Sequence, residues 1–421
     1  MNGRANSTGR NARLPARSGR HARVLIYSHD TFGLGHLRRC RAIAHALVER
    51  NPHMSVLILS GSPIIGNFDY KSRVDFVRIP GVIKRRNGEY TSLKLHIDID
   101  ETLAMRASII QHTAEIFDPD LFIVDKEPLG LHGEVKATLE MLRERGVPLV
   151  LGLRDVMDEP SLLVPEWQRK KVLPALQNLY DEIWVYGLPQ ICDPLAEIKL
   201  PESVRRKMVY TGYLRRATAA SPAAGPAVPI LEEPYLVVTA GGGGDGEALF
   251  DWVLRAYEHG RAAPIPALLV LGPFMPAETQ AELTQRAARL PQVRTMVFDA
   301  NIETYLSRAS GIVAMGGYNT FCEILSFDKP ALIVPRTVPR LEQYIRAKRA
   351  DEIGLVKMLV DDEKRPPQVM ATALRHLPQQ AVPSNVIVPG LLDGLGNINR
   401  AAKRLIATRG RPRVTLARGA A

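Results

Sequence analysis

The sequence has few cysteines and no long apolar run. Its three cysteines, Cys40, Cys192 and Cys322, lie far apart without the spacing of zinc ligands or of a disulfide framework. No segment approaches the roughly 18 to 20 apolar residues that span a bilayer, and the first residues lack the apolar stretch of a secretory signal. We therefore expect a protein of the reducing cytoplasm, with peripheral contact at the inner face of the membrane as an open alternative.

Acidic residues are absent from the first 23 positions, where six arginines lie, and from residues 405–421, where four more lie. These arginines account for nearly all of the net charge of +11, so the body of the chain is close to neutral. The composition predicts disordered basic tails over residues 1–22 and 408–421 rather than a nucleic-acid-binding surface. An arm for acidic lipids or nucleic acid and an organellar transit peptide stay open for the first tail.

Apolar, β-branched runs alternate with helical patterns along the chain, an order typical of α/β proteins. Because these runs are continuously apolar, they favour parallel sheets covered on both faces. Strands are predicted at residues 24–29, 55–61, 75–80, 121–126, 149–155 and 182–187, and again at 235–244, 267–272, 293–298, 311–317, 331–336 and 354–360. An Ala- and Pro-rich segment is predicted to be a linker. The predicted organisation is an N-terminal domain at 23–214, the linker at 215–234, a C-terminal domain at 235–385 and a final helix at 386–407.

Two glycine-rich segments follow predicted strands, but neither fits a dinucleotide or ATP site. In GLGHLRRC, Arg38 stands where the dinucleotide fingerprint needs its third glycine, and the next strand ends without an acidic residue. The GxxxxGK[ST] pattern is absent from the sequence as well. In TAGGGGDGE, by contrast, consecutive glycines allow backbone amides to wrap around an anion, at Gly241, Gly242, Gly243 and Gly244.

Neither a metal site nor a cofactor is expected from the motifs. Asp98 and Asp100 could be mistaken for a metal-binding DxD motif. Because they precede a long helical pattern, they predict a helix cap and an acidic first turn instead.

The most specific stretch is AMGGYNTFCEILSFDKPALIVPRTVPRLEQYIRAKRADEIG, residues 314–354. A predicted strand ends there in Gly316 and Gly317, and a helix that carries Thr320 and Glu323 follows. The stretch resembles the nucleotide-sugar half of the family 28 glycosyltransferases, typified by the peptidoglycan N-acetylglucosaminyltransferase, and the resemblance runs from residue 239 to 354. It implies the GT-B fold, in which two Rossmann-like domains with parallel sheets face a central cleft. The loop GLGHLRRC is also similar to the UDP-sugar hydrolase of pseudaminic acid synthesis.

The resemblance implies a UDP-sugar donor site in the C-terminal half. Thr320 lies near a helix start, where amide donors favour a phosphate, and Glu323 one turn later suits a ribose diol. The backbone of Phe298 would meet the uracil edge, and Glu342 with Gln343 would hold hydroxyls of the donor sugar. Together with the glycines at 241–244, 316 and 317, these residues would bind the donor without a metal.

The loop of GLGHLRRC is expected to face the acceptor or the diphosphate through Gly33, Gly35 and Arg38. His36 would lie in the first turn of a helix, whose dipole favours the neutral imidazole that a general base requires. A histidine that only binds the diphosphate or caps the helix stays open. Asp125 and Glu127, just beyond a strand, are the rival base or an anchor for the acceptor hydroxyl.

Three functions follow from these observations. The first is an inverting, metal-independent transferase that moves a hexose or N-acetylhexosamine from a UDP-sugar to a hydroxyl acceptor, including a lipid- or polysaccharide-linked one. The second is a UDP-sugar hydrolase of the same fold. The third is a non-catalytic binder of nucleotide-sugars or nucleic acid. The segment SLLVPEWQRKKVLPAL, residues 161–176, predicts a core helix with a basic outer face, and peripheral membrane contact is its alternative.

Overall fold

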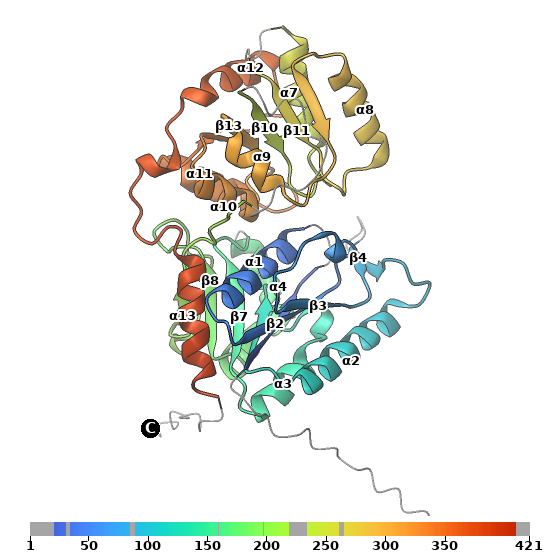
Figure 1. Cartoon of the computed structure of the whole chain (residues 1–421), viewed down its shortest axis with the longest axis vertical. Helices are drawn as coiled ribbons and strands as arrows, with labels where there is room; N and C mark the ends of the chain where they lie inside the picture. Colours follow the sequence, from blue (N-terminus) through green and yellow to red (C-terminus); the bar gives the residue numbers. More distant parts are fainter. Residues whose placement is uncertain are drawn as a thin grey trace, which may run out of the picture.

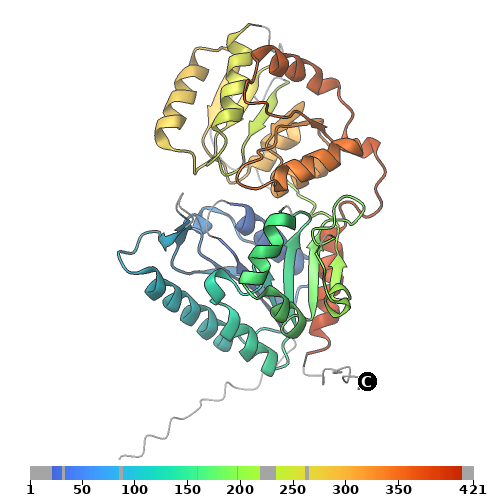
Figure 2. The same cartoon turned by 180° about the vertical axis from the view of Figure 1, so that it is seen from behind.

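A computed structural model describes residues 21–30, 34–84, 89–158, 160–196, 198–218, 234–260 and 265–409. Within these residues the chain forms two layered α/β halves, one above the other along the long axis of the molecule (Figure 1). Each half has its own parallel sheet with helices on both faces, and Figure 2 shows the same division from behind. The α/β class and the parallel sheets expected from the sequence are confirmed.

The sheet of the first half has the strand order β3-β2-β1-β6-β7-β8-β9, and all of its pairs are parallel. Strands β1 and β6 form the centre, where Val24 pairs with Leu121, and both strands are almost wholly buried, as their apolar runs predict. The strands are β1 (Ala22–Ser28), β2 (Met54–Ser60), β3 (Val74–Arg78), β6 (Leu121–Asp125), β7 (Leu149–Arg154), β8 (Glu182–Tyr186) and β9 (Met208–Tyr210).

Helices cover this sheet, and a small antiparallel hairpin extends from it. The helices are α1 (Gly35–Glu49), α2 (Ile99–Phe117), α3 (Lys136–Glu144), α4 (Pro160–Arg169), α5 (Val172–Asn178) and α6 (Glu202–Arg205), and the hairpin pairs β4 (Val82–Lys84) with β5 (Tyr90–Ser92). The Asp98 side chain accepts a hydrogen bond from the Asp100 amide at the start of α2. The predicted helix cap is therefore confirmed.

The sheet of the second half has the order β12-β11-β10-β13-β14-β15 and is also parallel. Its strands are short and buried at the centre: β10 (Leu236–Thr239), β11 (Ala267–Val270), β12 (Val293–Met296), β13 (Gly311–Ala314), β14 (Ala331–Ile333) and β15 (Lys357–Met358). Its helices are α7 (Glu247–Glu258), α8 (Ala277–Ala288), α9 (Ile302–Arg308), α10 (Tyr318–Phe327), α11 (Glu342–Glu352) and α12 (Pro367–His376). Short 3₁₀ turns lie at Ile65–Asn67, Leu131–Gly133, Leu377–Gln379 and Pro383–Asn385.

Helix α13 (Gly394–Ile406) returns from the second half to the first (Figure 1). Its Asn399 accepts a hydrogen bond of 2.9 Å from Asn51 at the end of α1, and its Asn397 donates one of 2.7 Å to the Thr211 carbonyl. The helix is shorter than the 386–407 expected, because residues 386–393 run as an extended segment and turns before it. The C-terminal segment thus fastens the two halves together.

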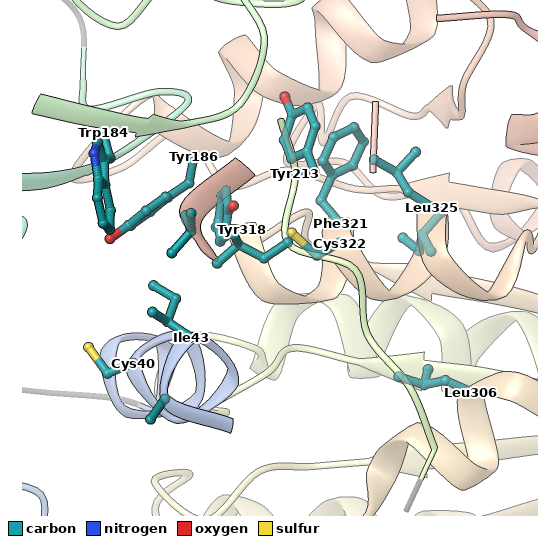
Figure 3. Packing of buried hydrophobic residues seen from close by; sticks show 14 of the residues in the cluster. Cys40, Ile43, Trp184, Tyr186, Tyr213, Leu306, Tyr318, Phe321, Cys322 and Leu325 are labelled. Carbon is teal, nitrogen blue, oxygen red and sulfur yellow. The ribbon is translucent and has the colours of Figure 1, made fainter. Parts of the chain in front are cut away.

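An aromatic cluster fills the junction between the halves (Figure 3). Tyr213, which follows β9, stacks on Tyr318 of α10 at 6.1 Å between ring centroids and meets Phe321 edge-on at 5.2 Å. These side chains are buried and belong to one apolar cluster with Trp184 and Tyr186 of the first sheet. Hydrophobic burial therefore holds the halves against each other at the end near β8 and β9.

Every predicted strand is present, but each ends sooner than expected. The strands predicted at 235–244 and 311–317 include their glycines, whereas β10 ends at Thr239 and β13 at Ala314. The glycines instead form loops that leave the sheet, which is the location where α/β proteins bind ligands. The tails lie largely outside the described residues, as do residues 219–233 of the expected linker, so the predicted domain ranges stay predictions.

The structure also bears on the expectations for the cysteines, for membrane-spanning helices and for the segment at 161–176. All three cysteines are free, so no disulfide framework exists. None of the helices described is both long and apolar enough to cross a bilayer. The segment at 161–176 forms two helices, α4 and α5, and not the single helix predicted, because Lys171 between them has a left-handed backbone. Leu163 and Trp167 are buried in the core and the basic residues 169–171 are exposed, as expected.

Candidate active site

A cavity lies between the two halves, at the carboxyl ends of both sheets. It holds about 1300 Å³ of space, its open mouth included. The first half contributes the start of α1, together with Phe68 and Arg154. The second half contributes the loop after β10, the loops after β11 and β12, the start of α10 and the start of α11. Parallel α/β sheets bind ligands at such an edge, so the cavity is the candidate active site.

The glycine loop after β10 forms one wall of the cavity. Its Gly241, Gly242, Gly243 and Gly244 all line the space. Gly243 has φ of +87°, and a Cβ built there would lie 2.1 Å from the Leu271 carbonyl oxygen, so only glycine fits. Gly241 has φ of +71° and open space around it. The loop is therefore packed tightly on its β11 side and free on its cavity side.

The start of α10 forms the adjoining wall. Gly317 precedes the helix, and the amides of its first turn are available to a ligand because no side chain caps them. Thr320 and Glu323 line the cavity one turn further on. Glu323 is only 1% exposed and contacts the Arg38 guanidinium, which also donates a 2.7 Å hydrogen bond to Glu303. Two carboxylates of the second half thus bind one arginine of the first.

His36 lies in the first turn of α1, on the opposite side of the cavity. Its Nδ1 contacts the Asp125 carboxylate, and Asp125 also accepts hydrogen bonds of 2.6 to 2.8 Å from the buried Arg39 guanidinium. Burial alone would raise the pKa of Asp125, but Arg39 and His36 lower it well below its usual range. Because Asp125 is ionised, Nδ1 carries the hydrogen that it donates, and Nε2 is left as the acceptor.

The imidazole of His36 is neutral at physiological pH. Burial lowers the pKa of His36 to about 4, although the Asp125 carboxylate opposes that shift. Arg39 and Lys126 add to the lowering because they are cations near the ring. A neutral imidazole with a free Nε2 at the edge of a cavity has the protonation state of a general base.

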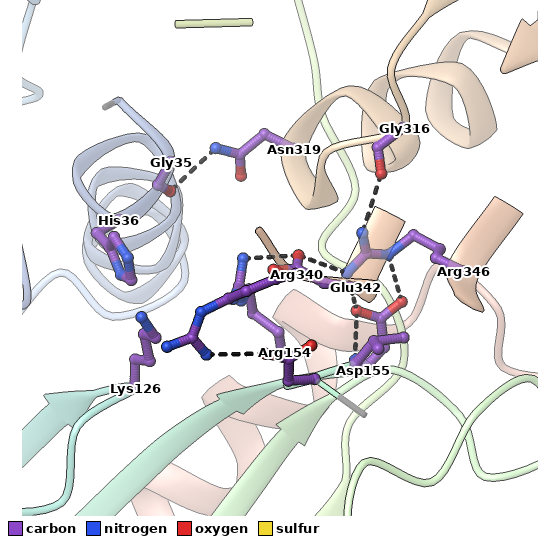
Figure 4. Close-up of polar contacts among 12 residues, drawn as sticks. Gly35, His36, Lys126, Arg154, Asp155, Gly316, Asn319, Arg340, Glu342 and Arg346 are labelled. Atoms are coloured by element: carbon purple, nitrogen blue, oxygen red, sulfur yellow. Dashed lines mark hydrogen bonds and ion pairs between the residues drawn. The ribbon is translucent and has the colours of Figure 1, made fainter. Parts of the chain in front are cut away.

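Ion pairs join the halves at the other end of the cavity (Figure 4). Glu342 at the start of α11 accepts from Arg154 at 2.7 Å and from Arg346 at 3.1 Å. Arg346 in turn donates two hydrogen bonds, of 2.6 and 2.8 Å, to Asp155, and both of these side chains are buried. The neighbouring Gln343 accepts a 3.2 Å hydrogen bond from the Arg336 amide. These contacts hold Glu342 and Gln343 at the cavity wall.

Comparisons with family profiles, with known sequences and with solved structures all find glycosyltransferases. Residues 237–383 match the profile of the glycosyltransferase family 28 C-terminal domain. An uncharacterized glycosyltransferase of Methanosarcina acetivorans is 24% identical over 403 residues, which are 89% of this chain and 96% of the relative. The UDP-N-acetylglucosamine--N-acetylmuramyl-(pentapeptide) pyrophosphoryl-undecaprenol N-acetylglucosamine transferase of Methylobacterium nodulans is 25% identical over 207 residues, 47% of this chain and 56% of the relative.

A solved structure shares the arrangement of both halves. The Phytolacca americana UGT2 complexed with UDP-2fluoro-glucose and pterostilbene superposes with a TM-score of 0.59 at 14% identity, covering 92% of this chain and 96% of that one. Residues 237–383 are thus a family 28 glycosyltransferase domain, and the two halves together have the GT-B fold. The family resemblance and the GT-B fold expected from the sequence are thereby confirmed.

The glycosyltransferase brings most of the predicted site residues to one cavity. Those that line it are Gly35, His36, Arg38, Gly241, Gly242, Gly243, Gly244, Phe298, Gly317, Thr320, Glu323, Glu342 and Gln343. Gly316 lies behind the wall, where its carbonyl accepts a hydrogen bond from Arg346. Gly33 lies outside the described residues. The roles given to these residues stay predictions.

The two rival bases lie away from the cavity lining. Asp125 is buried beneath His36, with both oxygens engaged, so it orients the imidazole instead of reaching an acceptor. Glu127 accepts a 2.9 Å hydrogen bond from Lys170. Burial alone would raise the pKa of Glu127, but Lys126 and neighbouring cations lower it to about 2. Of the three candidate bases, His36 is the one that lines the cavity.

Several cavity residues were not predicted from the sequence. Arg39 follows His36 by one helical turn, and Arg154 ends an otherwise apolar strand. Charged residues at a strand end could have been recognised, because such ends meet at the ligand edge of the sheet. Phe68, which contacts Phe298 edge-on at 5.9 Å, carries no such signal. Among the described residues no cluster of three or more His, Cys, Asp or Glu side chains is arranged to hold a metal.

Proposed function

We propose that this glycosyltransferase transfers a hexose or N-acetylhexosamine from a UDP-sugar to a hydroxyl acceptor, with inversion and without a metal ion. The observation that carries the proposal is the contact of His36 with Asp125 at the edge of a cavity whose opposite wall is a glycine loop and a helix start. That arrangement pairs a general base with an anion-binding wall.

His36 would act as the base in a single displacement. Its Nε2 takes the proton of the acceptor hydroxyl, and the oxygen attacks the anomeric carbon as the bond from that carbon to the diphosphate oxygen breaks. The leaving UDP keeps the electron pair, and backbone amides of the glycine loop and of α10 stabilise its charge. Because base and leaving group lie on opposite walls, attack occurs from the far face of the sugar and inverts the anomeric centre.

The assignment of UDP rests on chemistry and on relatives. Glu323 is a carboxylate one turn into α10, placed to accept both hydroxyls of a ribose once Arg38 releases it. The related transferase of Methylobacterium nodulans is named for UDP-N-acetylglucosamine, and the Phytolacca americana structure contains UDP-2fluoro-glucose. The acceptor is a hydroxyl compound, including lipid- or polysaccharide-linked ones, at a cytoplasmic or peripheral membrane location.

A panel of nucleotide-sugars tests the donor. We expect UDP-sugars to raise the melting temperature more than the corresponding GDP- and dTDP-sugars at equal concentration, because binding to the folded state alone stabilises it. The same panel with a labelled sugar separates the two enzymatic alternatives. Label on an added acceptor supports transfer, whereas label released only as free sugar would establish the hydrolase. If no nucleotide-sugar shifts the melting temperature, the donor assignment fails.

A further inference from the structure

Three cations, Lys126, Arg154 and Arg340, lie together beside His36 (Figure 4). Lys126 directly follows β6, Arg154 ends β7, and Arg340 precedes α11. The two strand ends belong to the first half and Arg340 to the second, so the cations approach from both sides of the cleft. Lys126 is close enough to affect His36, because its charge helps to lower the pKa of the ring.

Few of the hydrogen-bond donors of these cations have a partner among the described residues. Among the described residues the Lys126 ammonium makes no hydrogen bond, and its nearest carboxylate, Glu127, is 3.9 Å away. Arg154 donates to Glu342, but its Nε is buried without a partner. A guanidinium has five N–H donors and an ammonium three, so most of these donors are unused. Unpaired donors of this kind stabilise an anion that enters the site.

The carboxylates around the three cations are occupied elsewhere as well. Glu127 and Glu166 share Lys170, at 2.9 and 2.6 Å. Arg340 lies 3.3 Å from Asp158 and donates to Glu166 at 3.2 Å. These long or shared contacts neutralise the charge of the region, but they leave hydrogen-bond donors of the three cations without a partner. Burial lowers the pKa of Lys126 to about 8, so the side chain keeps its charge at physiological pH, and its ion-pair partner Glu127 lies at the long distance of 3.9 Å.

The backbone at Lys126 gives a second, independent observation. Its φ is +67°, in the left-handed region that glycine adopts freely and lysine does not. Strained residues of this kind cluster at functional sites, where the side chain is needed despite the cost.

We propose that Lys126, Arg154 and Arg340 bind an anionic group, a phosphate or a carboxylate, that the acceptor carries next to its reacting hydroxyl. The assignment rests on the proposed function, because it takes the cavity wall of the glycine loop and α10 as the donor side. Lys126 and Arg340 do not line that donor space, and they lie beyond His36 and Glu342. An anion held there would present a neighbouring hydroxyl to Nε2 of His36. The enzyme would thereby select charged acceptors over neutral ones.

Inorganic phosphate is the probe, titrated into the full-length protein by calorimetry at saturating UDP and constant ionic strength. Bound UDP fills the donor side, so the heat reports binding elsewhere. Lys126→Gly removes the ammonium and relieves the backbone strain, so the variant keeps its fold. Lys171→Gly is the matched control, since Lys171 also has a positive φ, of +52°, and is exposed. We expect Lys126→Gly to weaken phosphate binding at least about tenfold and Lys171→Gly to change it less than about twofold.

Two results would overturn the inference. One is an absence of phosphate binding by the wild-type protein at saturating UDP, and the other is equal binding by the Lys126→Gly variant. A separate arm compares UDP-glucuronate with UDP-glucose. A preference for UDP-glucuronate that disappears in Lys126→Gly would show that the anionic group bound by these cations belongs to the donor sugar and not to the acceptor. Failure of UDP itself to bind contradicts the proposed donor and not the anion site, because the phosphate titration can then be made without UDP.

Discussion

At the scale of single residues, the protonation state of His36 depends on a buried network of charges. Asp125 is 1% exposed, and a carboxylate is costly to bury without partners. Arg39 neutralises it through Nε and Nη2, while His36 takes one remaining lone-pair direction. The network therefore fixes both the orientation and the tautomer of the ring. Without Asp125 the ring could turn, and the hydrogen could move from Nδ1 to Nε2.

The first prediction concerns His36→Ala. We expect turnover to fall by roughly 10² to 10⁴, with UDP affinity nearly unchanged, because the imidazole handles the acceptor proton and the UDP-binding residues belong to the other half. Steady-state kinetics and calorimetric titration with UDP measure the two quantities. His45→Ala, a change to another half-buried histidine on α1 that lies outside the cavity, should leave both quantities unchanged.

The pH profile adds a test of the same residue. Because the pKa of His36 lies near about 4, the wild-type kcat/KM should stay level from neutral pH down to mildly acidic pH and fall only as the imidazole becomes protonated near that value. The acid limb should be missing from the profile of His36→Ala. If turnover in the variant stays within a few-fold of wild type with the same limb, another group is the base.

The second prediction concerns Asp125→Asn. The change leaves the Arg39 charge buried without a counter-ion, so we expect a loss of about 3 to 5 kcal/mol in the free energy of unfolding at pH 7. The pKa of Asp125 is lowered by folding, so its stabilisation is present above the unfolded value of about 4 and is lost as the pH falls below it. Urea unfolding at pH 7 and at acidic pH should show the gap between wild type and variant closing. In the double variant with Arg39→Gln, the loss should be smaller than the sum of the two single losses.

The sequence was sufficient to locate His36, Asp125 and Glu323, but it did not show which of them touch. Asp125 ends β6, and His36 lies in the first turn of α1, the helix that follows β1. Both positions are at the edge of a parallel sheet where its strands end. The partner of Glu323, in contrast, is Arg38 from 285 positions earlier in the chain. That pairing depends on how the two halves face each other, which no local pattern encodes. The same reason explains why Arg154 and its bond to Glu342 were not predicted.

At the scale of elements, the strands were predictable because a buried parallel strand is a continuous apolar run. Their ends were less predictable, since TAGGGG and AMGG continue apolar runs without a polar boundary. The hairpin of β4 and β5 and the start of α13 at Gly394 were missed. β4 and β5 have three residues each, and α13 packs on the other half of the molecule. Such elements depend on tertiary contacts more than on local sequence pattern.

The third prediction separates structural glycines from ligand-facing ones in the loop after β10. Gly243→Ala should lower the free energy of unfolding by on the order of 3 kcal/mol or more, because its Cβ would overlap the Leu271 carbonyl. Gly241→Ala should cost only about 1 to 2 kcal/mol of left-handed strain, yet reduce UDP affinity at least about tenfold, because its methyl group would enter the cavity. Thermal unfolding and UDP titration measure these effects.

Gly260→Ala is the matched control for Gly241→Ala. Gly260 has φ of +67° and open space around it, but it follows α7 outside the cavity lining. The control should share the loss of stability and keep the wild-type affinity for UDP. Equal affinity for UDP in the Gly241→Ala variant would contradict a donor site at this loop.

At the scale of the whole molecule, the two halves are joined by polar contacts on both sides of the cavity. Arg346 and Asp155 form a buried pair near the aromatic junction, and Arg38 meets Glu303 and Glu323 across the cleft. Asn319 of α10 also donates a 2.9 Å hydrogen bond to the Gly35 carbonyl at the start of α1. The second set involves Glu323, the residue expected to bind the ribose. If Glu323 binds the ribose as proposed, closure of the halves and binding of the nucleotide compete for one carboxylate.

The last prediction follows from this competition. It compares the affinities of the Arg38→Met variant for uridine and for UDP. Without the guanidinium Glu323 is free, so uridine, which has the ribose but no phosphate, should bind several-fold more tightly than to wild type. UDP should gain less than uridine or lose affinity, because Arg38 released from Glu323 can reach the diphosphate in the wild-type protein. Calorimetric titrations of both ligands give the ratio of the two effects. Glu323→Gln should weaken both ligands by on the order of 1 to 3 kcal/mol. Unchanged uridine affinity in both variants would show that Glu323 serves only to close the cleft and that the ribose binds elsewhere.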